Sequence, residues 1–257
     1  PMLNDNLERI RKKAKHDYDV KLFVTVYEEN YIVDSKNHYT VTFFDTVEDK
    51  YDIIICNPPT EFYGKYSEEA LTAGGVSLVK INAAFLFAKM AAKHLEEDGR
   101  LVIILPITYA TAAELSTLRK EMAKSLSINR IHLFIGKQKN LKRAVPLKKN
   151  FIISYEKGEK SGSIQITTST DAGKSITSLP PLPYDFVVDP ENGMLTLPKS
   201  VEDTNIVRYI SNFPETLSSL GLKMSTGLVI DSKCEGLLFT DPIRGSVPLI
   251  RPATMQN

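Results

Sequence analysis

Residues 51–64 read YDIIICNPPTEFYG, and this stretch decides the fold. The apolar run 52–56 is typical of a strand that is buried on both faces of a sheet. Pro58 and Pro59 end that strand, because proline lacks an N–H and fixes φ. Asn57 precedes a proline and is therefore expected to be extended. It should lie at the carboxyl end of a buried strand, which is where ligands bind in open α/β sheets.

The Asn57 amide allows two interpretations. Held in place at a sheet edge, it offers one acceptor and two donors in a fixed plane. The same residues also suit a simple strand-ending turn, since Asn-Pro is common in turns. The local pattern does not choose between these interpretations.

A second apolar strand, 100–106, also ends in proline. Between it and strand 52–56, residues 78–99 are rich in helix-forming residues and stop at Gly99, an expected C-cap. Because a helix of crossover length joins them, strands 52–56 and 101–105 are expected to be adjacent and parallel.

The remaining pattern extends this alternation. No helix separates strands 128–136 and 151–158, so they are expected to form a hairpin with a long loop. The order predicts an α/β fold with a Rossmann-like, doubly wound, mainly parallel sheet, followed by a small irregular region. Further elements are expected as strands at 20–28 and 39–45, an edge strand at the start of the segment that follows residue 160, a helix at 3–19, and a helix at 111–126 with Thr111 and Glu114 as a capping box.

Bulk composition excludes several classes. The 257 residues are 42% apolar and 25% charged, with a formal net charge of +1, so any nucleic-acid surface must be local. Cys56 and Cys234 are far apart and, like the histidines, lack metal-ligand spacing, so no metal site is expected. No apolar run approaches a membrane span and the amino-terminal stretch is charged, so neither a membrane span nor a signal peptide is expected. A reduced, cytoplasmic protein is expected, and its abrupt ends indicate a piece of a longer chain.

The combination of motifs is specific. An acidic residue, an apolar strand, Asn-Pro-Pro at its carboxyl end, a helix and then EDGRLVIILP (97–106) resembles the S-adenosylmethionine-dependent enzymes that methylate adenine N6 in DNA. The resemblance is strongest to those of bacterial restriction–modification systems. It covers 39–156 well and 215–233 moderately. KMSTGLVIDSK (223–233) is similar to the segment where, in that branch, the catalytic domain meets the target-recognition region.

The resemblance implies the chemistry of the Asn57 turn. The Asn57 side-chain oxygen and the Pro58 backbone oxygen would each accept one N6–H and orient the nitrogen lone pair toward the methyl donor. The target adenine would first leave the duplex stack. The family's usual aromatic residue after the prolines is replaced here by Thr60. Expected substrate contacts are Pro59, Thr60, Phe62, Tyr63 and Phe151, where the aromatics could stack on the base or simply pack in the core.

The cofactor side departs from the family. Its glycine-rich loop has no counterpart, because no glycine precedes Gly64. The resemblance assigns Asp45 to the adenine amino group of S-adenosylmethionine, although a turn-forming aspartate is the alternative. The S-adenosylmethionine pocket is therefore expected to be incomplete in this chain.

A basic stretch, KQKNLKRAVPLKKN (137–150), carries no acidic residue. It falls on the loop predicted between the last two strands, near the same end of the sheet as Asn57. It suits either a solvated loop or contact with DNA phosphates. The expected phosphate contacts are Lys137, Lys139, Lys142, Arg143, Lys148 and Lys149.

The expected organisation is a partial catalytic core at 1–170, a linker and helical connection at 171–222, and the start of a target-recognition region from 223. The expected function is methylation of adenine N6 in DNA by a restriction–modification enzyme. Its partners would be double-stranded DNA with a flipped adenine and a restriction or specificity subunit or domain. Two alternatives stay open: an Asn-Pro-Pro methyltransferase acting on RNA or a protein glutamine, and a non-catalytic DNA-binding or assembly module.

The 257-residue chain is expected not to bind S-adenosylmethionine tightly by itself. Asp45 would hold only the adenine end, and one charge-assisted hydrogen bond contributes ~1.5–3 kcal/mol. A micromolar site needs about 8 kcal/mol. Isothermal titration calorimetry checks this, and a low-micromolar dissociation constant would show that the start of the domain is misplaced.

Overall fold

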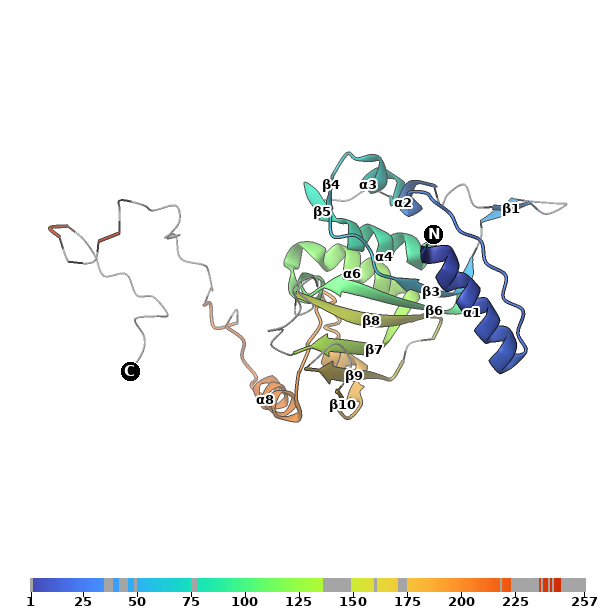
Figure 1. Ribbon diagram of the computed structural model, residues 1–257. Helices are drawn as coiled ribbons and strands as arrows, with labels where there is room; N and C mark the ends of the chain where they lie inside the picture. Colours follow the sequence, from blue (N-terminus) through green and yellow to red (C-terminus); the bar gives the residue numbers. More distant parts are fainter. Residues whose placement is uncertain are drawn as a thin grey trace. The chain divides into compact units, whose positions relative to one another are not determined.

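The computed structural model describes residues 2–34, 39–41, 46–48, 50–74, 78–135, 149–159, 161–170, 175–217 and 219–222, with a few single residues between 236 and 245. The chain divides into two units, Pro1–Val207 and Arg208–Asn257. The first unit contains the central sheet (Figure 1).

That sheet is mixed, in the order β10-β9-β7-β8-β6-β3, with β11 also paired to β9. β3 and β6 are parallel, as are β7 and β9, while β8 is antiparallel to both of its neighbours. The strands β3, β6, β7 and β9 therefore share one direction. The sheet strands are Tyr51–Cys56 (β3), Leu95–Pro106 (β6), Leu126–Phe134 (β7), Asn150–Lys157 (β8), Ser163–Ser169 (β9), Ile176–Ser178 (β10) and Leu182–Pro183 (β11).

This arrangement confirms the predicted α/β class. β3 and β6 are adjacent and parallel, with Ile54 opposite Leu101. β7 and β8 form the predicted antiparallel pair. The segment expected as an edge strand is instead inside the sheet, because β9 pairs with β7 on one side and with β10 and β11 on the other.

Smaller elements surround the sheet. They are α1 (Met2–Tyr18), α2 (Tyr31–Asp34), β1 (Tyr39–Val41), β2 (Thr46–Glu48), β4 (Phe62–Gly64), α3 (Glu68–Thr72), β5 (Lys80–Asn82), α4 (Ala83–Lys93), α5 (Thr108–Thr111), the 3-10 turn η2 (Ala113–Leu115), α6 (Ser116–Ser125), α7 (Tyr184–Val187) and α8 (Val201–Ser211). Helix α1 confirms the predicted amino-terminal helix. None of the helices in the described part of the chain is both long and apolar enough to cross a bilayer.

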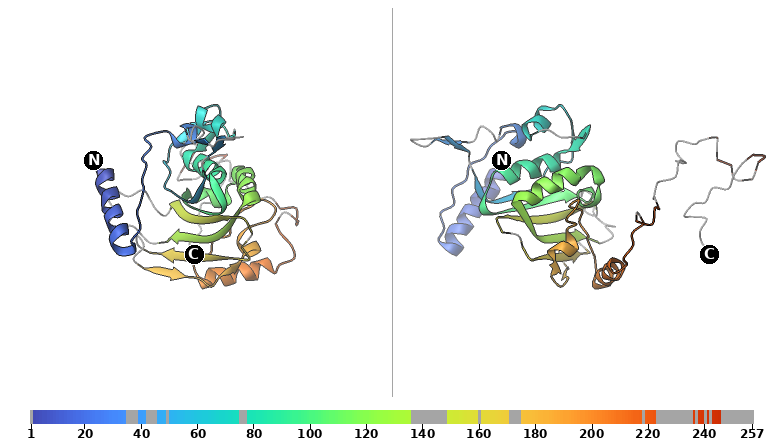
Figure 2. Two further views of the ribbon diagram at one scale, coloured as in Figure 1. Left: turned by 90° about the vertical axis from the view of Figure 1, so that its right-hand side faces the viewer. Right: turned by 180° about the vertical axis from the view of Figure 1, so that it is seen from behind.

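Helices α4 and α6 lie on the same face of the sheet (Figures 1 and 2). Side chains that alternate along the strands, such as Leu101 and Ile103, are fully buried beneath them. The opposite face is different at β3, where Ile53 and Ile55 are 66% and 79% exposed. The prediction of a strand buried on both faces is therefore wrong, because the Ile53 and Ile55 side chains point to a face of β3 that the described residues leave uncovered.

The helix predicted at 78–99 is shorter than expected. Residues 80–82 form a strand, α4 ends at Lys93 with His94 as C-cap, and β6 already starts at Leu95. Gly99 is not a cap. A Cβ at Gly99 would lie 2.7 Å from the Glu96 carbonyl oxygen, and Asp98 has a φ of 62°. The glycine thus permits a tight irregular turn where β6 enters the sheet.

Two further local predictions are wrong. The structure describes all of residues 20–28, and they form no strand, since no described strand pairs with them. The capping box at Thr111 is also absent, because α6 begins at Ser116 without a side-chain cap. Instead, the buried Arg119 donates through Nη1 to the carbonyls of Tyr109 and Ala112 at 2.9 and 2.8 Å. These bonds tie α6 to the turn that follows β6.

The folded unit extends past the boundary expected at residue 170. β10 and β11 pair with β9, and Leu182, Val187 and Leu195 are buried. The stretch expected as a linker from residue 171 is therefore part of the folded unit as far as Val207.

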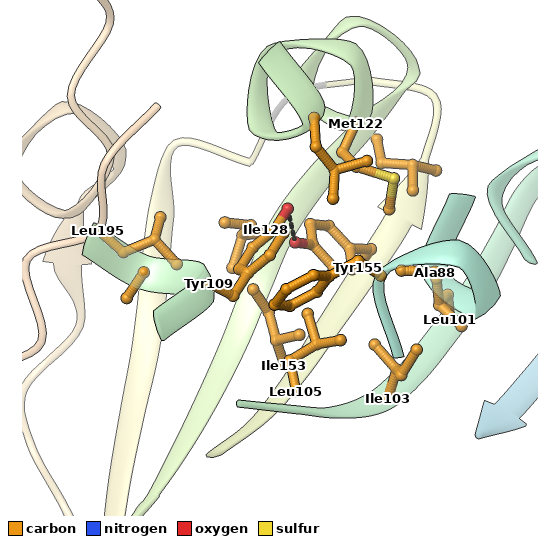
Figure 3. Close-up of a cluster of buried hydrophobic side chains, with 14 of the residues drawn as sticks. Ala88, Leu101, Ile103, Leu105, Tyr109, Met122, Ile128, Ile153, Tyr155 and Leu195 are labelled. Carbon is orange, nitrogen blue, oxygen red and sulfur yellow. Dashed lines mark hydrogen bonds between the residues drawn. The ribbon is translucent and has the colours of Figure 1, made fainter. Parts of the chain in front are cut away.

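A pair of buried tyrosines joins the sheet to its helical layer (Figure 3). Tyr155 on β8 donates to the Tyr109 hydroxyl at 2.8 Å. The Tyr109 ring packs against Phe85 and Phe151, at centroid distances of 5.9 and 6.4 Å. Burial raises the pKa of Tyr109 to about 12, so this hydrogen bond persists across the neutral pH range.

Removing one hydroxyl from this pair should destabilise the chain. Tyr155→Phe and Tyr109→Phe are each expected to lower the free energy of unfolding by about 1–3 kcal/mol, because each leaves a buried hydroxyl without its partner. The double variant should lose less free energy of unfolding than the sum of the two single losses. Denaturant unfolding of the four proteins measures this, and strictly additive losses would show that the hydroxyls are not coupled.

Candidate functional site

The Asn57 turn lies at one edge of the sheet. β3 ends at Cys56, and residues 57–61 form no helix or strand. Asn57 is exposed and Pro58 is buried. Since β3 and β6 are parallel, Pro106 at the end of β6 marks the same edge. This confirms that the strand ends before the prolines and that Asn57 stands at its carboxyl end.

The turn is attached to the start of α4. The Ala83 amide donates to the Glu61 carbonyl at 2.9 Å, and Asn82 Nδ2 donates to the Thr60 carbonyl at 3.4 Å. Directly after the turn, β4 pairs antiparallel with β5, with Phe62 opposite Asn82. The turn is thus held between a sheet strand on one side and a helix start on the other.

The aromatic candidates differ in their accessibility. Phe62 is 66% exposed, whereas Tyr63 is half-buried and donates from its hydroxyl to Glu61 Oε1 at 2.7 Å. That hydrogen bond is the main cause that raises the pKa of Tyr63 to about 12. Tyr63 therefore acts as a neutral phenol that is already engaged by Glu61.

Phe151 does not belong to an open site. It is 0% exposed on β8, between Leu105 of β6 and Leu133 of β7. A ring that is covered on both sides presents no face to a base, so the assignment of Phe151 as a stacking residue is corrected to a core residue. Of the aromatic candidates, Phe62 offers the most open surface.

Cys56 directly precedes the turn. Burial raises the pKa of its thiol to about 11. The thiol is therefore protonated at neutral pH and is a poor nucleophile. The groups at this edge that are suited to bind a substrate are therefore the amide and carbonyl oxygens of the turn.

Several predicted residues lie outside the described part of the chain. They are Asp45, five of the basic residues (Lys137, Lys139, Lys142, Arg143 and Lys148) and the segment 223–233. Lys149 is described and exposed, and its carbonyl accepts from the Ile107 amide at 2.7 Å. Because Pro106 pairs with Asn150, Lys149 lies at the same edge of the sheet as Asn57.

Sequence reasoning missed Asn82. It placed the helix start at residue 78, whereas Asn82 is the N-cap of α4 and bonds the turn. The signal was present, since an asparagine directly before a run of helix-forming residues is a typical N-cap. Within the described residues, no group of three or more His, Cys, Asp or Glu side chains could hold a metal ion.

Comparison with known proteins gives this edge its context. Residues 2–140, more than half of the 257-residue chain, match the Eco57I restriction-modification methylase family. The chain belongs to the Eco57I restriction-modification methylase family. The match includes the Asn57 turn, β4, β5 and α4, so the structural elements around the turn fall within the family's shared region.

Two curated relatives match most of this chain. The Type II methyltransferase M.PstI of Providencia stuartii is 28% identical over 211 residues, which are 81% of this chain and 42% of that protein. M.BsuBI of Bacillus subtilis is 27% identical over 202 residues, 77% of this chain and 40% of that protein. The chain therefore spans less than half the length of either relative.

A solved structure with partial similarity is a putative class I S-adenosylmethionine-dependent methyltransferase from Listeria monocytogenes. It has a TM-score of 0.40 and 16% sequence identity, and the match covers 49% of this chain and 39% of that chain.

Proposed function

We propose that this chain is the catalytic part of an S-adenosylmethionine-dependent enzyme that methylates adenine N6 in DNA within a restriction–modification system. The observation that carries the proposal is the exposed Asn57 at the carboxyl end of β3, followed by buried Pro58, in a chain of a restriction-modification methylase family. The position of Asn57 at the sheet edge and the family match both support methyl transfer to an amine.

The turn suits an amine acceptor site. The adenine N6 nitrogen is a weak nucleophile because its lone pair is delocalised into the ring. The Asn57 Oδ1 and Pro58 carbonyl oxygens would each accept one N6–H, which steers the nitrogen toward tetrahedral geometry and directs its lone pair. Pro58 is buried, which restricts the backbone of the turn, while Asn57 is exposed. The contribution of both is orientation and electrostatic stabilisation.

The reaction balances without a general base acting before attack. S-adenosylmethionine, when bound, supplies an electrophilic methyl group on sulfur. In the transfer, the N6–methyl bond would form as the sulfur–methyl bond breaks, and one N6 proton would then leave to solvent. The protonated Cys56 thiol beside the turn takes no part in these changes.

The described residues fit the target side of this site. An exposed amide, a fixed carbonyl and an exposed aromatic residue, Phe62, gather within one short segment. On the cofactor side, Asp45 would contact the adenine amino group of S-adenosylmethionine. Pro59 and Thr60 would border the target base, and Phe62 rather than Thr60 would stack on it.

Double-stranded DNA is the proposed partner. A flipped adenine would reach Asn57 from the open side of the turn at a cost of ~a few kcal/mol. The basic residues of 137–149 would contact phosphates, and exposed Lys149 lies at the correct edge for this role. A restriction or specificity subunit or domain is proposed to complete the enzyme.

Asn57→Ala should nearly abolish methyl transfer in an enzyme that contains this chain and its cofactor-binding segments. Loss of one positioned polar group commonly lowers kcat by ~10²–10³-fold. Cofactor affinity should change less than about twofold, because the lost hydrogen bonds go to the target amine. Transfer of labelled methyl groups to DNA, RNA and protein measures the rate and identifies the substrate class.

Asn6→Ala is the matched control, since Asn6 is an exposed asparagine on α1 far along the chain from the turn. It should keep normal turnover. Near-normal turnover of Asn57→Ala on DNA would contradict the assignment, and transfer to RNA or protein instead of DNA would favour the alternative substrate classes.

Phe62→Ala should weaken productive DNA binding. Stacking of a base on an aromatic ring contributes ~1–3 kcal/mol, so the KM for DNA should rise by about 10- to 100-fold. Phe62→Trp should retain most activity because it keeps a stacking surface. Phe23→Ala, at a 79% exposed phenylalanine outside the turn, is the control. An unchanged KM in Phe62→Ala would exclude stacking on this ring.

A further inference from the structure

Asn82 uses both ends of its side-chain amide. It is 8% exposed, at the end of β5 and directly before α4. Its Oδ1 accepts from the Ala84 amide at 2.9 Å, which caps the helix, and its Nδ2 donates to the Thr60 carbonyl at 3.4 Å. One buried side chain therefore joins the helix start to the Asn57 turn.

The neighbouring backbone makes the same connection. The Ala83 amide donates to the Glu61 carbonyl at 2.9 Å, so successive carbonyls of the turn are bound by successive residues at the start of α4. The β4–β5 pairing continues this contact from Phe62 onward. The chain is thus fixed from Thr60 to Gly64, immediately after the acceptor residues.

The helix that provides this anchor is rigidly packed. Ala83, Ala84, Leu86 and Ala88 of α4 are buried, and α4 packs against β6. Asn57, Pro59 and Thr60 are exposed by contrast. Burial of Pro58 and the bonds from Asn82 and Ala83 therefore hold the turn to the core.

We propose that Asn82 is a positioning residue that sets the placement of the Asn57 and Pro58 acceptor oxygens, an inference that rests on the proposed methyl-transfer function. A distance of 3.4 Å is long for an amide–carbonyl hydrogen bond, so its loss affects global stability little. The placement of acceptors is more sensitive, because a misplacement of ~1 Å in a reacting geometry can lower a rate by ~10²-fold.

Two substitutions separate the cap from the anchor. Asn82→Asp keeps an oxygen for the Ala84 amide but replaces the donor to Thr60 with an anionic oxygen. Asn82→Ser keeps a good cap and is too short to bond Thr60. Both should lower kcat about tenfold or more, with cofactor KM within about twofold. Thermal unfolding should stay close to that of the unmodified chain in Asn82→Ser, whereas the buried carboxylate of Asn82→Asp, which faces a carbonyl oxygen, should also lower it.

Ser67→Ala is the control for cap loss alone. Ser67 caps α3 by accepting from the Ala70 amide at 3.2 Å, and its side chain has no bond to residues 57–61 among those the structure describes. It should keep normal kcat. Asn82→Ala should add a loss of thermal stability to the loss of kcat, because it removes the cap as well.

Hydrogen exchange of the 257-residue chain tests the anchor without relying on activity. In Asn82→Asp and Asn82→Ser, the amides of residues 60–64 should exchange faster than in the unmodified chain and in Ser67→Ala, while α4 keeps its protection. Unchanged exchange in residues 60–64, or unchanged kcat in both variants, would overturn the inference. Absence of methyl transfer in the unmodified enzyme, with faster exchange in the variants, would instead overturn the proposed function.

Discussion

The parallel pairing of β3 with β6 is the constraint on which the rest of the structure depends. β6 ends at Pro106, and β3 ends at Cys56, just before Asn57 and two prolines; their shared direction brings both ends to one edge. A parallel pair cannot be joined by a tight turn, so the chain must leave that edge after Asn57 and return to the other end of β6. α4 makes this return, and its start remains beside the turn that it left.

This connection explains how a short exposed turn keeps a defined position. The Asn57 turn has no ladder of its own, but its carbonyls are bound by the residues that open α4. α4 is in turn buried against the sheet, and the Tyr109–Tyr155 pair ties the same layer to β8. Packing of the apolar core thus fixes a polar turn on the surface, which is the preorganisation that an amine acceptor site needs.

The open side of β3 is the other distinctive feature. Ile53 and Ile55 are strongly exposed, although the run DIIIC has the composition of a strand covered on both faces. The segment 20–28, which is also rich in β-branched and aromatic residues, forms no strand. Both segments have high strand propensity, but propensity decides neither burial nor pairing: the described residues leave one face of β3 uncovered, and no described strand pairs with 20–28.

The sequence by itself determined the alternation of strands and helices, the β3–β6 adjacency, the β7–β8 hairpin and the place of Asn57 at a strand end. These depend on local signals: apolar runs, prolines and helix-forming residues act within a few positions of one another. Only the tertiary structure decided that Phe151 is buried, that β9 lies inside the sheet, that Gly99 permits a tight turn and that Asn82 bonds the turn. Each of these depends on which distant segment packs alongside, and the residues of a single strand or helix do not by themselves specify that neighbour.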